Sequence, residues 1–103
     1  MTLPKTVRIA GVTIKIVEKD LSDFDDECYG YYVHDKQTIV IGKGLSAKVR
    51  EETLCHEMIH AALDCSGISF SKGFEQLEEP LVRTVHTLFL PAWERVQKRL
   101  SKS

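Results

Sequence analysis

The stretch that decides the fold runs from Glu51 to Ala62 and reads Glu-Glu-Thr-Leu-Cys-His-Glu-Met-Ile-His-Ala-Ala. Within it, His56 and His60 are the two ends of a His-Glu-x-x-His motif. Positions i and i+4 of an α-helix lie on one face, about one turn apart, so both imidazoles can aim a nitrogen at the same point. Zinc accepts histidine nitrogens at about 2.0–2.1 Å. We therefore predict one Zn²⁺ per chain, bound by His56 and His60.

Glu57 follows the first histidine and flanks the predicted metal without binding it. A carboxylate there can take a proton from a water that the metal activates, so we predict Glu57 as the catalytic general base. The competing interpretation is a pair of surface histidines on an amphipathic helix with an exposed glutamate between them.

The third protein ligand is expected from the start of the second helical segment, because a catalytic zinc site needs three protein ligands and one open position. Glu78 lies three and seven residues before Leu81 and Val85, so it shares their apolar stripe and is expected to point toward the first helix. We predict Glu78 as the third ligand, with Glu79 as the runner-up. Pro80 complicates the choice, because a proline disfavours helical geometry at the residue before it.

The chain before the motif predicts two antiparallel β-hairpins. Residues 7–10 and 12–17 alternate apolar and polar side chains around a turn near Ala10 and Gly11. Residues 29–34 and 37–41 form the second predicted hairpin, around Asp35 and Lys36.

Two helical regions are predicted after the strands. Ser46 is a suitable N-cap for a helix that continues to about residue 65, and Gly67 stands where a C′ glycine would end it. A second apolar stripe follows, which Pro91 is expected to end or kink, and residues 93–100 read as a basic, amphipathic tail. Strands followed by helices predict an α+β fold, and we expect residues 1–103 to form a single domain.

Composition narrows the range of partners. The formal net charge is −1 and the sequence pI is near 6.4, so we expect no nucleic-acid partner. No apolar run is long enough to cross a bilayer and the N-terminus lacks a signal-peptide core, so we expect a cytoplasmic protein without a membrane partner. Three cysteines without a Cys-x-x-Cys pair favour reduced thiols.

The motif helix and the Leu-Glu-Glu-Pro-Leu-Val-Arg segment together resemble short gluzincin-type zinc metallopeptidases, many of them encoded by phages or prophages. The resemblance covers about residues 12–89. It implies a zincin-like fold in which His56, His60 and Glu78 bind zinc and Glu57 is the catalytic base.

Weaker candidates surround the motif. Asp64, four residues after His60, is either an acceptor that orients an imidazole or a helix-end carboxylate in water. Donors that could stabilise an oxyanion are not distinguished by any spacing; they are His34, His86, Tyr31 and Tyr32. The segment 29–32 is either a sheet edge that pairs with an extended peptide or a packed strand.

The function that we predict is zinc-dependent hydrolysis of a peptide or protein substrate. The alternative is a catalytically silent, zinc-stabilised protein-binding module, such as a phage regulatory protein. Hydrolysis of a non-peptide amide would use the same chemistry. Nothing in the sequence indicates an oligomeric state.

Overall fold

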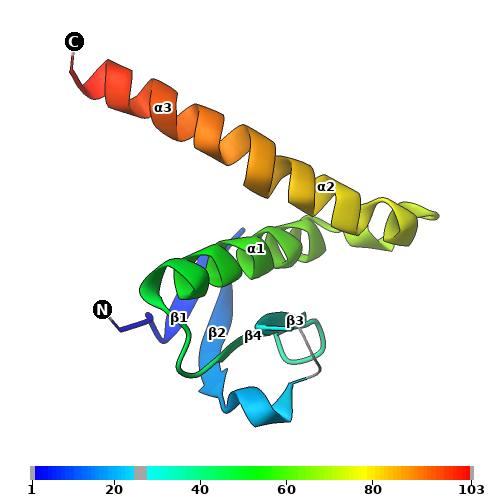
Figure 1. Cartoon of the computed structure of the whole chain (residues 1–103). Helices are drawn as coiled ribbons and strands as arrows, with labels where there is room; N and C mark the ends of the chain where they lie inside the picture. The colour runs from blue at the N-terminus through cyan, green and yellow to red at the C-terminus, as the bar shows by residue number, and fades with distance from the viewer. Residues whose placement is uncertain (1, 25–27, 103) are drawn as a thin grey trace.

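A computed structural model describes residues 2–24 and 28–102 of the chain, and it combines one β-sheet with helices (Figure 1). The strands are β1 (Thr6–Ile9), β2 (Val12–Lys19), β3 (Gly30–Val33) and β4 (Thr38–Gly42). The helices are α1 (Ala47–Ser66), α2 (Glu78–Thr84) and α3 (Leu90–Ser101), and a π-helical turn, η4 (Val85–Phe89), joins the last two. Short 3₁₀ turns are η1 (Leu21–Asp23), η2 (Ile68–Phe70) and η3 (Phe74–Gln76).

The four strands form one mixed sheet in the order β1-β2-β4-β3. Both predicted hairpins are confirmed, because β1 pairs antiparallel with β2 and β3 pairs antiparallel with β4. The two hairpins join through a parallel pair, in which Ile16 of β2 lies opposite Ile39 of β4. Our sequence analysis did not predict this pairing, because alternation shows which side chains face the core but not which strands become neighbours. β3 is consequently an edge strand.

The main core lies between the sheet and α1. Ile14 and Ile16 of β2 and Ile39 and Ile41 of β4 are buried there together with Ala61 of α1. Side chains two positions apart on a strand point to the same face, so each strand supplies a pair of isoleucines to this layer. The short side chain of Ala61 lets α1 approach the sheet closely.

The ends of α1 follow the predicted capping signals. The Ser46 Oγ accepts a hydrogen bond of 3.3 Å from the backbone N–H of Val49, and Gly67 has the left-handed φ of 85° that favours glycine after a helix. The helix therefore spans 20 residues and carries the whole His-Glu-x-x-His motif in its second half.

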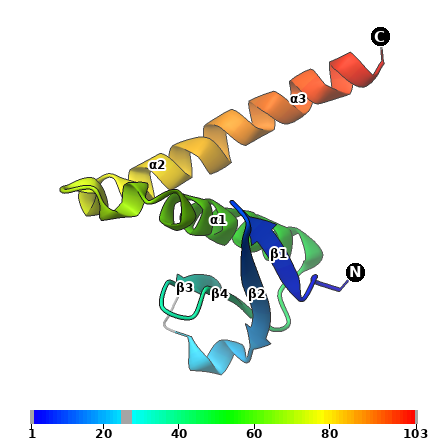
Figure 2. The same cartoon turned by 180° about the vertical axis from the view of Figure 1, so that it is seen from behind.

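The second helical region is longer than its apolar pattern suggested. The backbone is helical from α2 through η4 to α3, and the N–H of Leu90 bonds to the carbonyl of Val85 in the π pattern. We expected Pro91 to end or kink the helix; instead it lies in the first turn of α3, where its missing N–H costs little, and the irregular turn precedes it. In both views α3 projects away from the sheet and from α1 (Figures 1 and 2). Among the described residues, no helix has the length and hydropathy to span a bilayer.

Candidate metal centre

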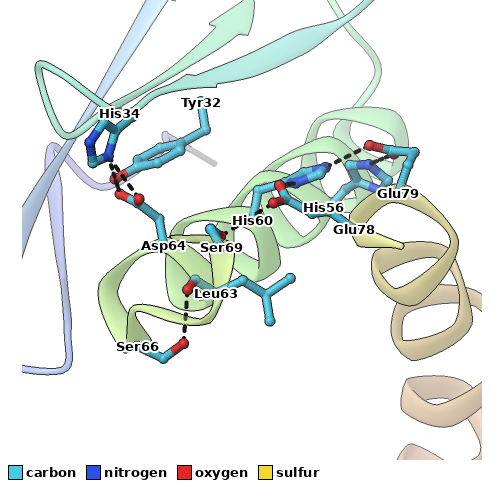
Figure 3. Close-up of polar contacts among 10 residues, drawn as sticks. All are labelled: Tyr32, His34, His56, His60, Leu63, Asp64, Ser66, Ser69, Glu78 and Glu79. Carbon is cyan, nitrogen blue, oxygen red and sulfur yellow. Dashed lines mark hydrogen bonds and ion pairs between the residues drawn. The ribbon is translucent and has the colours of Figure 1, made fainter. Parts of the chain in front are cut away.

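His56 and His60 lie one turn apart on α1, with their ring centroids 5.1 Å apart. Both side chains are largely covered, with exposed fractions of 24% and 14%. The i, i+4 spacing therefore brings the two imidazoles together as predicted, on the side of α1 that faces the start of α2 (Figure 3).

Glu79 of α2 joins the two histidines. Its Oε1 is 2.8 Å from Nε2 of His56, and its Oε2 is 3.0 Å from Nε2 of His60. One ligand atom from each of these three residues lies within 4.8 Å of the other two, and this is the group in the described part of the chain that could hold a metal ion.

The donor set fits zinc. Catalytic zinc sites often use two imidazole nitrogens and one carboxylate oxygen, at about 2.0–2.2 Å from the ion, and leave a fourth position open. Donors at that distance in a tetrahedral arrangement lie about 3.3 Å from one another. The nitrogen–oxygen distances of 2.8 and 3.0 Å are close to this spacing, so small shifts of the Glu79 side chain would admit an ion.

Glu78, the third ligand in our sequence-based prediction, lies on the other side of His60. Its Oε2 is 2.6 Å from Nδ1 of His60, and its Oε1 accepts a hydrogen bond of 3.2 Å from the hydroxyl of Ser69. Both nitrogens of His60 are therefore engaged by carboxylates, Nε2 by Glu79 and Nδ1 by Glu78. Histidines that bind metals commonly have such a carboxylate on their second nitrogen, where it fixes the orientation of the ring.

The different placement of the two glutamates follows from the face of α2 that packs inward. The prediction of Glu78 assumed that Leu81 faces the core, but Leu81 is 37% exposed whereas Val82 is fully buried. Val82 is three residues after Glu79, and residues at that spacing share a face of a helix. The buried face of α2 therefore carries Glu79 toward the two histidines.

Glu57 is the most deeply buried charged residue near the histidines, with 8% of its surface exposed. Burial raises the pKa of its carboxyl to about 7; the neighbouring His60 opposes this shift and Glu79 adds to it. No group in the described chain hydrogen-bonds to its carboxylate, and no side-chain oxygen there is both buried and unpaired. The carboxylate is thus open to the cavity that it lines.

That cavity has a volume of about 650 Å³, within the range of ligand pockets. One wall is the edge strand β3, through Gly30, Tyr31 and Tyr32, and the opposite wall is the motif helix with the two glutamates of α2. Our sequence analysis did not single out Gly30. A Cβ atom at this position would lie 2.7 Å from Cγ2 of Thr53 and 2.9 Å from the carbonyl oxygen of Val40, so only glycine lets β3 approach α1 this closely.

Asp64 does not contact the motif histidines. It accepts a hydrogen bond of 2.7 Å from the hydroxyl of Tyr32 and lies 2.7 Å from Nδ1 of His34 (Figure 3). The imidazole that it orients is therefore that of His34, and burial together with Asp64 raises the pKa of Tyr32. Tyr32 and Tyr31 line the cavity; His34 belongs to this separate cluster and packs edge-on against Phe70.

His86 lies beside His56, with ring centroids 5.6 Å apart and planes inclined by 64°. His86 is seven residues after Glu79, about two helical turns, so both residues lie on the side of the helix that faces His56. This spacing was visible in the sequence, but it became informative only once Glu79 was known to face the motif.

Two imidazoles and a carboxylate from neighbouring helices, with a buried glutamate beside them, define a metallopeptidase-like domain. The chain belongs to the family described as the IrrE N-terminal-like domain, Peptidase_M78, whose model matches residues 10–95. No curated protein and no solved structure matches the chain. The family match extends from the first hairpin into α3 and ends before its last turns.

Proposed function

We propose that the chain is a zinc-dependent peptidase with a zincin-like site, in which His56, His60 and Glu79 hold one Zn²⁺ and Glu57 is the general base. One observation carries the proposal: a single carboxylate, that of Glu79, reaches Nε2 of both motif histidines. Glu57 is on the same helix and lines the same cavity. We therefore favour Glu79 over Glu78 as the third ligand.

Glu57 has the properties that proton transfer at neutral pH requires. A general base works best when its pKa is close to the working pH, and burial raises the pKa of Glu57 to about 7. Its carboxylate would take a proton from a water in the cavity and return it to the amine that leaves. A bound zinc ion would supply the Lewis acidity that polarises the substrate carbonyl and makes the attacking water more acidic.

Glu78 acts in this proposal as a positioning residue. By engaging Nδ1 of His60 at 2.6 Å, it holds the ring so that Nε2 faces Glu79. Ser69 donates to the other oxygen of Glu78 and thereby restrains this carboxylate. Its removal is expected to weaken metal binding without abolishing it, because partners of metal ligands typically contribute about 10- to 100-fold in affinity.

The edge strand β3 favours a peptide as the substrate. β3 pairs with β4 on one side, and no strand of the described chain pairs with its other side. Gly30 and Tyr31 of this strand also line the cavity, opposite the motif. An extended peptide that adds to a sheet edge gains backbone hydrogen bonds, and here its carbonyl groups would pass in front of Glu57.

Replacement of Glu57 by Gln tests the catalytic role. The zinc-loaded full chain would be incubated with a library of unstructured peptides, and new termini would be detected by mass spectrometry. We expect Glu57→Gln to keep its zinc and to cleave at least about 100-fold more slowly, the usual contribution of a general base. Glu52→Gln removes an exposed carboxylate from the same helix and is the matched control.

Equal cleavage by Glu57→Gln and wild type would contradict the role of Glu57. If zinc-loaded wild type cleaves no peptide of the library, the peptidase proposal fails and the zinc-stabilised binding module becomes the better account. The zinc content of each variant separates these outcomes from loss of the metal.

A further inference from the structure

The helix α3 exposes a continuous apolar stripe. Phe89, just before it, and Trp93, Val96 and Leu100 within it are 57%, 43%, 42% and 62% exposed. They follow one another at spacings of four, three and four residues, so they lie on one face of the helix, as the a and d positions of a coiled coil do. A helix whose large apolar side chains face water in this pattern is expected to have a partner.

The partner is not the rest of the same chain. The backbone is helical without a loop from Glu78 to Ser101, and it carries α3 away from α1 and the sheet (Figures 1 and 2). For the stripe to fold back, this helix would have to break. Val96 and Leu100 also lie beyond residue 95, where the family match ends, so the stripe is not a feature that the match accounts for.

The same chain carries an apolar groove of about 570 Å³ on the outer side of α1. Ile9 of β1, Val85 of η4 and apolar side chains of α1 such as Leu54 and Leu63 line it, and Glu51 is its one charged lining residue. From Leu54 to Leu63 the helix rises about 14 Å, and from Phe89 to Leu100 it rises about 17 Å, so stripe and groove are of similar length.

We propose that the groove is occupied by α3 of a second copy of this chain, so that two chains exchange their last helices across a two-fold axis. Val85 lines the groove and α3 starts five residues later, so each α3 leaves the molecule beside its own groove. A two-fold axis then pairs the same two surfaces twice.

The charges select the direction of the exchanged helix. Besides Glu94, the charged residues of α3 are all basic, and Lys98, Arg99 and the adjoining Lys102 gather at its C-terminal end. When the partner's α3 lies antiparallel to α1, this end meets Glu51 at the N-terminal end of the groove. A standard stable interface buries about 1,600 Å² in total, so each of the two helix–groove contacts needs to bury about 800 Å².

Molar mass in solution tests the proposal. Light scattering after size-exclusion chromatography of the full chain should show twice the 11.7 kDa of one chain. We expect Val96→Asp on the stripe and Ala62→Arg in the groove each to raise the dimer dissociation constant by about 10-fold or more. Val96 and Ala62 are both exposed, so neither change should unfold the chain. The matched control is Gln97→Asp, which adds the same charge beside the stripe and should leave the dimer intact.

A mixture of the two variants shows whether helix and groove meet each other. Val96→Asp retains a wild-type groove and Ala62→Arg retains a wild-type helix, so mixing them should restore one contact and produce a mixed dimer. A dimer that forms in Ala62→Arg as in wild type would place the interface between two α3 helices and overturn the proposal. A monomer at about 100 μM, far above a micromolar dissociation constant, would also overturn it, with or without binding of α3 to vesicles of anionic phospholipid.

Discussion

The hydroxyl of Tyr32 donates a hydrogen bond of 2.7 Å to Oδ2 of Asp64, which ties the edge strand β3 to α1 one turn beyond His60. Tyr32 also lines the cavity of the candidate site. The bond therefore holds one wall of that cavity at a fixed distance from the helix that carries the motif, and Gly30 permits the close approach at the other end of the strand.

Removal of this hydroxyl should destabilise the chain. Tyr32→Phe deletes one hydrogen bond to a carboxylate in a partly buried site, and we expect the free energy of unfolding to fall by about 1–2 kcal/mol. Urea denaturation followed by circular dichroism measures the change. Tyr31→Phe is the control, because no hydrogen bond to the Tyr31 hydroxyl holds the strand. Equal effects of the two substitutions would show that the Tyr32–Asp64 bond does not stabilise the fold.

The pairing of His34 with Asp64 should make stability depend on pH. The hydrogen bond and the charge of Asp64 raise the pKa of His34 above its ordinary value of about 6.5. A raised folded-state pKa stabilises the fold fully below the unfolded pKa, and this contribution is lost as the pH rises through the folded pKa. Unfolding measured at a series of pH values should therefore show wild type losing stability, relative to His34→Gln, as the pH increases above about 6.5. A constant difference between the two proteins would contradict this account.

His86 should support His56 through the contact between their rings. His60 has a carboxylate on its second nitrogen, whereas the second nitrogen of His56 has no hydrogen-bond partner in the described chain, and His86 packs against its ring. We expect His86→Ala to weaken zinc binding by about 10-fold and His86→Phe, which preserves an aromatic ring, to weaken it less. Competition with a chromogenic chelator measures the affinity, and the visible spectrum of the Co²⁺-substituted protein reports the ligand geometry. If both variants bind like wild type, His86 has no positioning role.

The parts of the site that sequence predicted are those that local geometry determines. His56 and His60 come together because four residues separate them on one helix, and Ser46 and Gly67 mark where that helix begins and ends. The strands of each hairpin are likewise neighbours along the chain. None of these inferences required knowledge of a distant contact.

The parts that sequence did not predict depend on how distant elements pack. The choice between Glu78 and Glu79 depends on whether Leu81 or Val82 faces inward, and both are apolar. The parallel pairing of β2 with β4 depends on the path between two hairpins. The role of Gly30 depends on the side chain of Thr53, which belongs to a different element.

Zinc binding by wild type and by the Glu78→Gln and Glu79→Gln variants tests the central claim most directly. The measurement is the zinc content and zinc affinity of each purified chain, by elemental analysis and chelator competition. We predict one zinc per chain in wild type, a loss of affinity of about 10- to 100-fold in Glu78→Gln, and a larger loss in Glu79→Gln, which removes a ligand. Wild type without zinc after incubation with excess metal, or a Glu79→Gln variant that binds as tightly as wild type, would contradict the account.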